Sequence, residues 1–237
     1  MSEKFLFMAS EVRSGSTFFA ELISYSFHKS YGEEFWDLSR ELLSTLKDSS
    51  TRDEMLSITR NLYLNKSGYR SCKIMCAQLS IISREARKDQ EIKDIFFGDN
   101  TYWIVFRRKN KIKQAISLAM ARKSNIYHSY DADMKVSKAD TVSMEDIDRA
   151  LKAIAISDEY LKCFSKNFKN YIEIFYEDAL EAQKQSVTDV ITKLDMPFDI
   201  SRLQIEEPKL KPYESLKKTE LENRFIEWFS INYHSTQ

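Results

Sequence analysis

The sequence predicts an α/β protein with a central, mainly parallel β-sheet flanked by helices. Each of four short runs rich in aromatic and β-branched residues is followed by a helix-like segment, a pattern that indicates βα units. The first and third runs are almost entirely apolar, which is typical of strands buried on both faces. The runs are "FLFMAS" (5–10), "SCKIMC" (71–76), "YWIVFR" (102–107) and "YIEIFY" (171–176).

The chain of 237 residues fits a single domain, 1–237, without internal repeats or a Pro-rich linker. Residues 143–168 predict one long helix. Its core-compatible positions are Ile147, Leu151, Ile154, Leu161 and Phe164. Hydrophobic periodicity disappears between Tyr127 and Val142. We therefore expect a mobile loop over 127–142, of a length that is more often functional or disordered than incidental.

Composition restricts the partners. Basic and acidic side chains number 36 each, so no overall positive field favours nucleic acid. No uncharged apolar run approaches the roughly 18–20 residues of a membrane span, and the first residues do not resemble a secretory signal. Three cysteines are too few for a disulfide framework. We expect a cytoplasmic protein without a membrane span or a nucleic-acid partner.

A metal site is not expected either. Cys72 and Cys76 would lie on one face of the second strand by period-2 alternation. No second pair of Cys or His completes a site, and Cys163 stands alone. These residues are therefore interpreted as structural thiols.

The segment "RSGST" (13–17) follows the first predicted strand and opens a helix near Gly15. The first turn of a helix presents unpaired N–H groups and partial positive charge, and glycine lets a ligand approach the backbone. Ser14, Ser16 and Thr17 add hydroxyl donors, and Arg13 adds a bidentate cation. The pattern predicts an anion site. The alternative is a well-capped helix with a solvated arginine.

Five stretches together resemble the sulfotransferase family, in particular its bacterial trehalose 2-sulfotransferase-like branch. "RSGST" resembles the 5′-phosphosulfate loop, and "YEDAL" (176–180) the tyrosine–acid–acid turn. "GEEFW" (32–36) resembles "GEPQEFF", "KIMCAQ" (73–78) resembles "KLMWNQ", and "RRKNKIKQAISLAMA" (107–121) resembles "HRPDVVSQAVSFWRA". The blocks occur in matching order. The resemblance implies a P-loop-like three-layer fold and 3′-phosphoadenosine 5′-phosphosulfate as the sulfuryl donor.

The resemblance implies two anion sites for this donor. The 5′-phosphosulfate would bind the N–H groups of Gly15 to Phe18, the hydroxyls of the loop and Arg13. Arg108 matches the family's 3′-phosphate arginine and Ser117 matches its partner serine, although Arg107 next door leaves the choice of arginine open.

Ser117 falls at the edge of the predicted buried stripe of its helix, about 60° from Met120 at 100° per residue. The stripe consists of Ile112, Ala115, Ile116, Ala119 and Met120. A serine at this boundary can meet a ligand, and the alternative is a solvent-facing side chain.

For catalysis, the resemblance implies a glutamate base and cations at the departing phosphate. Glu34 matches the glutamate before the aromatic pair, and Glu33 matches the earlier acid of the same block. Two residues are missing here, so the register between them stays open, and we favour Glu34. An acidic pair that merely favours a helix start is the alternative. Arg13 is the candidate for stabilising the departing phosphate.

Other polar residues have weaker assignments. Lys73 is expected to contact the sulfate or the acceptor, or else to guard an edge strand against aggregation. Gln78 is a candidate for hydrogen bonding to a sugar hydroxyl. Glu177 and Asp178 are interpreted as architecture, with Asp178 capping a helix. His128 is interpreted as a residue at the lip of the site rather than as a rival base.

Lys217, Lys218 and Arg224 could close over the nucleotide, but a solvated helical face is the favoured interpretation. The acceptor implied by the resemblance is a small molecule, a hydroxyl of a carbohydrate or glycolipid-like compound. The segments expected to recognise it, 32–60 and 127–142, match poorly. They offer Phe35, Trp36, Tyr127 and Tyr130 for stacking or packing.

Two rival functions remain. A nucleotide-dependent kinase is disfavoured because the loop lacks the lysine of G-x-x-x-x-G-K-[ST]. A nucleotide-binding homologue without catalysis would keep both anion sites and lose the base. The resemblance also allows a homodimer, and it requires no metal.

Overall fold

The computed structural model describes residues 3–32, 38, 52–62, 64, 68–125, 142–208 and 216–234. Its centre is a sheet in which every neighbouring pair of strands is parallel, in the order β2-β1-β3-β4. The strands are β1 (Lys4–Ser10), β2 (Tyr69–Met75), β3 (Thr101–Arg107) and β4 (Asn170–Phe175). All four predicted strands and the parallel α/β architecture are confirmed.

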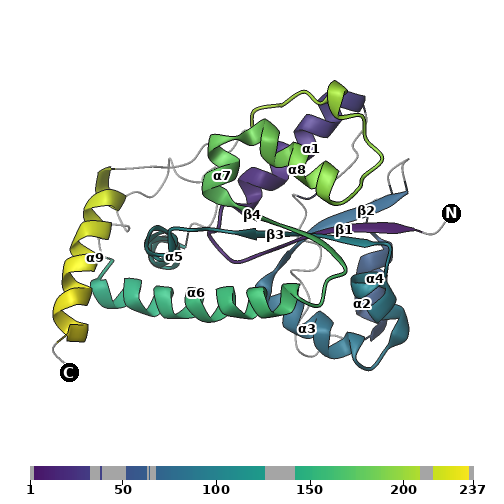
Figure 1. Ribbon diagram of the computed structural model, residues 1–237. Coiled ribbons are helices and arrows are strands. Elements are labelled where there is room, and N and C mark those ends of the chain that lie inside the picture. Colours follow the sequence, from purple (N-terminus) through teal and green to yellow (C-terminus); the bar gives the residue numbers. More distant parts are fainter. Residues whose placement is uncertain are drawn as a thin grey trace.

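Helices cover both faces of this sheet (Figure 1). One face carries α1 (Ser16–Tyr31), α7 (Tyr176–Glu181) and α8 (Gln183–Lys193). The other carries α2 (Arg52–Arg60), α3 (Cys76–Ala86), α4 (Gln90–Phe97) and α6 (Met144–Ser165). Beyond the carboxyl ends of the strands lie α5 (Lys111–Ser124) and α9 (Leu216–His234), and a short 3₁₀ turn spans Ile200–Arg202. The predicted long helix is α6.

The carboxyl ends of two strands come one residue earlier than expected. Tyr176 and Cys76 were predicted as the last residues of strands, but each begins a helix, α7 and α3 respectively. Cys72 and Cys76 therefore do not share a strand face, and that prediction is wrong. Both thiols are buried, and burial raises the pKa of the Cys76 thiol to about 12, which keeps it protonated at neutral pH.

Period-2 alternation decides which layer each strand side chain enters. In β1, Leu6 and Met8 pack toward α1 and α8, whereas Phe7 and Ala9 pack toward α3 and α6. The same rule sends successive residues at a strand's carboxyl end to opposite sides of the sheet. It therefore controls the placement of every polar side chain at that edge.

A third apolar cluster joins α5, α6 and α9 next to the carboxyl edge. Ile116 of α5, Ile154 of α6 and Phe225 of α9 are fully buried within it. The cores of α5 and α6 agree with the predicted stripes, except that Ile112, Met120 and Leu151 are partly rather than fully buried. Packing on two other helices fixes α5, which carries several of the predicted site residues.

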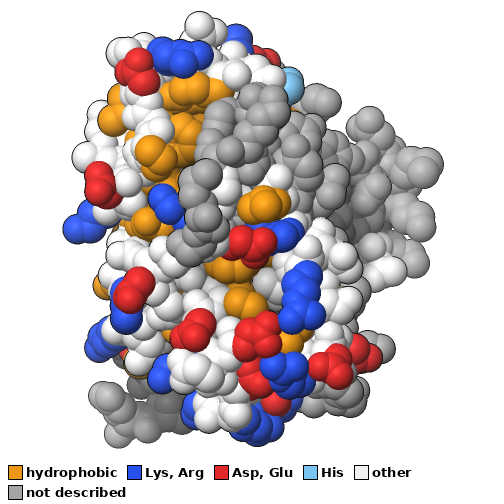
Figure 2. All heavy atoms as spheres, turned by 90° about the vertical axis from the view of Figure 1, so that its right-hand side faces the viewer, with side chains coloured by type: hydrophobic (Ala, Val, Ile, Leu, Met, Phe, Trp, Pro, Cys, Tyr) orange, Lys and Arg blue, Asp and Glu red, His pale blue; other side chains and the backbone are white. Residues whose placement is uncertain are grey.

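Figure 2 shows the side of the molecule where the strands begin. Lys, Arg, Asp and Glu side chains are intermixed over the lower half of this view. Between α2 and the start of α4, Arg52 bonds Asp89 and Glu91, and Arg60 bonds Glu91. Exposed pairs of this kind contribute little to stability. Among the described residues, no helix has both the length and the apolar character that crossing a bilayer requires.

Candidate functional site

The segment between β1 and α1 adopts a backbone shape that presents N–H groups. Gly15 is the N-cap residue of α1 with φ 93°, and Arg13 also has a positive φ of 58°. No side chain caps this helix, so the N–H groups of its first turn have no partner within the helix or from an N-cap side chain. The Ser14 Oγ is buried and has no hydrogen-bond partner among the described residues. Both observations fit an anion at this position.

Two cations lie at this loop, one from the loop itself and one from β2. The Nε of Arg13 donates to the Oγ of Ser117 on α5 at 3.0 Å, so the loop arginine is not simply solvated. The Nζ of Lys73 donates to the Oγ1 of Thr17 at 2.9 Å. Lys73 is only 2% exposed, so it does not guard a strand edge in water. The loop sequence contains no lysine, and Lys73 of β2 places an ammonium group next to the loop instead.

Arg108 lies on the same side as the loop. Its Nη1 donates to the backbone oxygen of Arg13 at 3.4 Å, and its Nε lies 3.8 Å from Oε1 of Glu177. The guanidinium carbon is 4.8 Å from the centre of the Tyr176 ring. The Nε is buried and makes no hydrogen bond within the described part of the chain. Arg108 therefore retains hydrogen-bonding capacity beside the loop.

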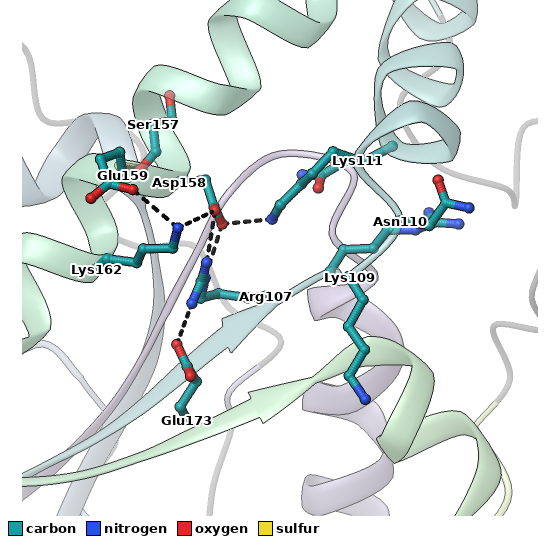
Figure 3. Close-up of polar contacts among 12 residues, drawn as sticks. Arg107, Lys109, Asn110, Lys111, Ser157, Asp158, Glu159, Lys162 and Glu173 are labelled. Atoms are coloured by element: carbon teal, nitrogen blue, oxygen red, sulfur yellow. Dashed lines mark hydrogen bonds and ion pairs between the residues drawn. The ribbon is translucent and has the colours of Figure 1, made fainter. Parts of the chain in front are cut away.

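Arg107 points to the opposite side of the sheet, where carboxylates surround it (Figure 3). Its Nε and Nη2 donate to Asp158 of α6 at 2.9 and 2.7 Å, and its Nη1 donates to Glu173 of β4 at 2.5 Å. Lys111 adds a third cation–carboxylate contact, 2.6 Å from Oδ1 of Asp158. Arg107 is thus committed to internal partners, and of the two neighbouring arginines Arg108 is the one beside the loop.

The Asp158 carboxylate keeps its charge beside Arg107 and Lys111. Burial by itself would raise the pKa of Asp158, but hydrogen bonds from Arg107 and Lys111 outweigh it and hold the pKa below its ordinary value. Glu11, directly after β1, shows the reverse balance. Burial raises the pKa of its carboxyl more than its hydrogen bonds to Val12 and Ser157 lower it.

The turn after β4 differs in one respect from expectation. Asp178 was predicted to cap α7, but that helix has no side-chain cap, and Asp178 pairs with Lys109 instead. Glu177 accepts hydrogen bonds from the backbone N–H groups of Lys109 at 2.8 Å and Asn110 at 3.1 Å. The acids therefore fix the connection between β3 and α5, because their partners lie on that connection rather than on their own helix.

Of the remaining predicted residues, some lie in the described part of the chain and others lie outside it. Ser117 is buried on α5 at 5% exposure, so the solvent-facing alternative is wrong. The Oε1 of Gln78, in the first turn of α3, is buried and without a hydrogen-bond partner among the described residues. Arg224 is exposed on α9, the same helix that carries Lys217 and Lys218. Several predictions lie outside the described residues: Glu33, Glu34, His128, the four candidate stacking aromatics, and the loop except for Val142.

Sequence reasoning missed three residues at this edge. Asp158 had a signal, because it occupies the buried stripe of α6 between Ile154 and Leu161, where a charge requires a partner. Glu11 had a weaker one, as a carboxylate at the end of a buried strand. Tyr176 was quoted within the acidic turn, but its contact with the loop depends on tertiary packing.

A comparison with family models matches residues 5–227 to the family described as Stf0 sulphotransferase. The search of curated proteins found no match. Solved structures with low similarity include a retinol dehydratase in complex with androsterone and the inactive cofactor PAP. It is 15% identical with a TM-score of 0.45, and the match covers 97% of this chain and 82% of that one.

A mouse sulfotransferase, SULT7A1, complexed with PAP is 12% identical with a TM-score of 0.42, over 99% of this chain and 87% of that one. A sulfotransferase domain from the Synechococcus PCC 7002 olefin synthase is 13% identical with a TM-score of 0.35, over 95% and 96%. The family match over residues 5–227 alone identifies the family of this chain.

Proposed function

Because the chain belongs to the Stf0 sulphotransferase family, we propose that it transfers a sulfuryl group from 3′-phosphoadenosine 5′-phosphosulfate to a hydroxyl of a carbohydrate or glycolipid-like acceptor. The trehalose 2-sulfotransferase-like branch is the proposed place within the family. The acceptor class comes from that resemblance.

Two adjoining groups of hydrogen-bond donors and cations support the proposal. One is the uncapped N-terminus of α1 with Arg13, Lys73 and the buried Ser14 hydroxyl. The other is Arg108, held beside this loop with an Nε that makes no hydrogen bond within the described residues. A donor with anions at its 5′ and 3′ positions needs two such features, whereas a nucleoside monophosphate needs one.

The loop residues would act at the 5′ end. Backbone N–H groups from Gly15 to Phe18, and the hydroxyls of Ser14, Ser16 and Thr17, would hold the phosphosulfate oxygens. When bound, the donor supplies the sulfuryl group, whose bond to a phosphate oxygen breaks as a bond to the acceptor oxygen forms. Arg13 would stabilise the negative charge left on the phosphate.

The buried ammonium of Lys73 would reinforce the same end of the site, because it already donates to Thr17 of the loop. Arg108 would take the 3′-phosphate. Ser117 would link Arg13 to the 3′-phosphate, because the serine hydroxyl accepts a hydrogen bond from Arg13 and can donate its own O–H to the phosphate.

The acceptor's proton needs a base. We assign that role to Glu34, with Glu33 as the neighbouring candidate, and we assign Gln78 to a hydroxyl of the acceptor. The glutamate would take the proton as the acceptor oxygen attacks, so that the products are the anionic sulfate ester, adenosine 3′,5′-bisphosphate and a protonated glutamate. A homodimer remains compatible with this assignment.

Calorimetric titration tests the donor site first. Adenosine 3′,5′-bisphosphate should bind at least tenfold more tightly than AMP, with ATP as a second control, because the two adenosine 5′-phosphates lack the 3′-phosphate. Equal binding of bisphosphate and AMP would overturn the donor assignment.

Acceptor screening tests the chemistry. With the phosphosulfate donor present, sulfate transfer to free sugars, glycolipids and non-carbohydrate alcohols should be measured by mass spectrometry. Glu34→Gln should retain bisphosphate binding and lose transfer, and Glu33→Gln is its matched control. Transfer lost in Glu33→Gln and kept in Glu34→Gln would move the base by one residue.

A further inference from the structure

We propose that Tyr176 is a positioning residue that holds Arg108 at a fixed place relative to the loop after β1, and thereby determines the preference for a 3′-phosphate. The inference rests on the proposed function, because it concerns the second anion site of the same donor.

The first evidence is the contact between the Tyr176 ring and Gly15. A Cβ atom on Gly15 would lie 2.3 Å from Cδ2 and 2.6 Å from Cε2 of this ring, so the ring packs directly on the glycine backbone. Phe18, one turn into α1, meets the ring edge-on at 6.1 Å between centroids. Tyr176 itself is 7% exposed. The ring is therefore fixed against the segment that presents N–H groups.

The second evidence is the contact between the same ring and Arg108. The guanidinium carbon lies 4.8 Å from the ring centroid, within the range of a cation–π interaction. The side chain of Arg108 is 13% exposed, and a desolvated guanidinium gains more from a ring face than an exposed one does. One aromatic ring thus touches both the loop and the arginine.

Strand register explains why this residue has both neighbours. In the parallel pairing of β3 and β4, Arg107 lies opposite Phe175. The next residues along the two strands, Arg108 and Tyr176, leave the sheet together and turn to the α1 side. Glu177 then accepts the N–H groups of Lys109 and Asn110, which anchors the backbone directly after Arg108. The arginine is held through both its main chain and its ring contact.

The experiment measures the ratio of AMP to bisphosphate dissociation constants by calorimetry. Both ligands share the adenosine, so any contact of the tyrosine hydroxyl with the nucleoside cancels in the ratio. Tyr176→Phe keeps the ring and should keep the ratio. Tyr176→Leu removes the π face and should reduce the ratio by about threefold to thirtyfold, the span expected from a cation–π contact.

A shape-preserving variant covers the case in which Tyr176→Leu fails to fold. Pentafluorophenylalanine at position 176 retains the ring but removes its negative face, and it should lower the ratio relative to Tyr176→Phe. Tyr31→Leu is the matched control, because Arg202 lies 4.8 Å from that ring on the far end of α1. Its ratio should equal that of the unmodified protein.

Three outcomes decide the matter. A lower ratio in the fluorinated and leucine variants, with Tyr176→Phe and Tyr31→Leu unchanged, supports the inference. An unchanged ratio in the fluorinated variant overturns it while the donor assignment stands. No preference for bisphosphate in the unmodified protein overturns the proposed function instead.

Discussion

Arg107 and Arg108 are adjacent in the chain, yet they occupy opposite electrostatic environments at the end of β3. Arg107 makes three hydrogen bonds of 2.5–2.9 Å to the carboxylates of Asp158 and Glu173. Within the described part of the chain, Arg108 has one hydrogen bond of 3.4 Å, to a backbone oxygen, and one carboxylate oxygen at 3.8 Å. The carboxylate oxygens lie close around the first guanidinium and further from the second.

The difference supports a structural role for the charge of Arg107 and the proposed donor-binding role for that of Arg108. A buried cation surrounded by carboxylates stabilises the fold only as part of its cluster, and it has little left for a ligand. A cation with long contacts and an aromatic ring beneath it is desolvated but not neutralised. Two identical side chains can therefore be assigned different roles from their partners alone.

The largest expected effect comes from removing Asp158. Asp158→Ala leaves Arg107 and Lys111 without their shared carboxylate, and breaking a buried pair in this way costs about 3–5 kcal/mol. Urea unfolding at pH 7 would measure the loss of unfolding free energy. Asp99→Ala is the control, since Asp99 pairs with Lys169 at the surface, and it should cost less than about 1 kcal/mol. Equal costs would erase the distinction between the two arginines.

The next largest effect concerns ligand affinity rather than stability. Arg108→Ala should weaken bisphosphate binding by about 10- to 100-fold, because a charge-assisted contact contributes about 1.5–3 kcal/mol. AMP binding and the urea midpoint should change little. Arg224→Ala, on the exposed face of α9, is the control for loss of one positive charge. A parallel loss of AMP affinity would assign Arg108 to the 5′ site.

Acid titration sharpens the structural half of the comparison. The pKa of Asp158 in the folded protein lies below its unfolded value of about 3.9, so its contribution is present above that pH and is lost as pH falls through the folded pKa. The unfolding free energy of the unmodified protein should therefore fall more steeply between about pH 4 and pH 2 than that of Asp158→Asn. Parallel pH profiles would contradict this.

The smallest effect is expected at Glu11, on the same side as Arg107. Its folded pKa is raised above the unfolded value of about 4.3, so its contribution is present below that pH and is lost as pH rises through the folded pKa. Glu11→Gln should therefore gain stability relative to the unmodified protein between pH 4 and pH 7. A gain that is the same at both pH values would show that ionisation of Glu11 is not the cause.

The sequence allowed the strands, the loop between β1 and α1 and the long helix to be predicted, because each depends on local periodicity or on turn chemistry. It could not separate Arg107 from Arg108, since their roles depend on where β3 ends, and a one-residue error in that boundary reverses the side that each faces. Asp158 lies 51 residues from Arg107, and its pairing required the packing of α6 on the sheet. The Tyr176 contact likewise arises from the pairing of β3 with β4.

Alternation along β3 also has a consequence for how the chain can tolerate changes in length. One residue inserted or deleted within β3 would send the arginine that pairs with Asp158 to the side of the loop after β1, and its neighbour into the carboxylates. Both roles would be damaged at once, although the composition of the strand would hardly change. Added residues in a connection outside the sheet, such as the exposed residues 87 and 88 directly after α3, leave the alternation intact. Homologues and engineered chimeras should therefore be aligned on the length of β3 before their arginines are compared.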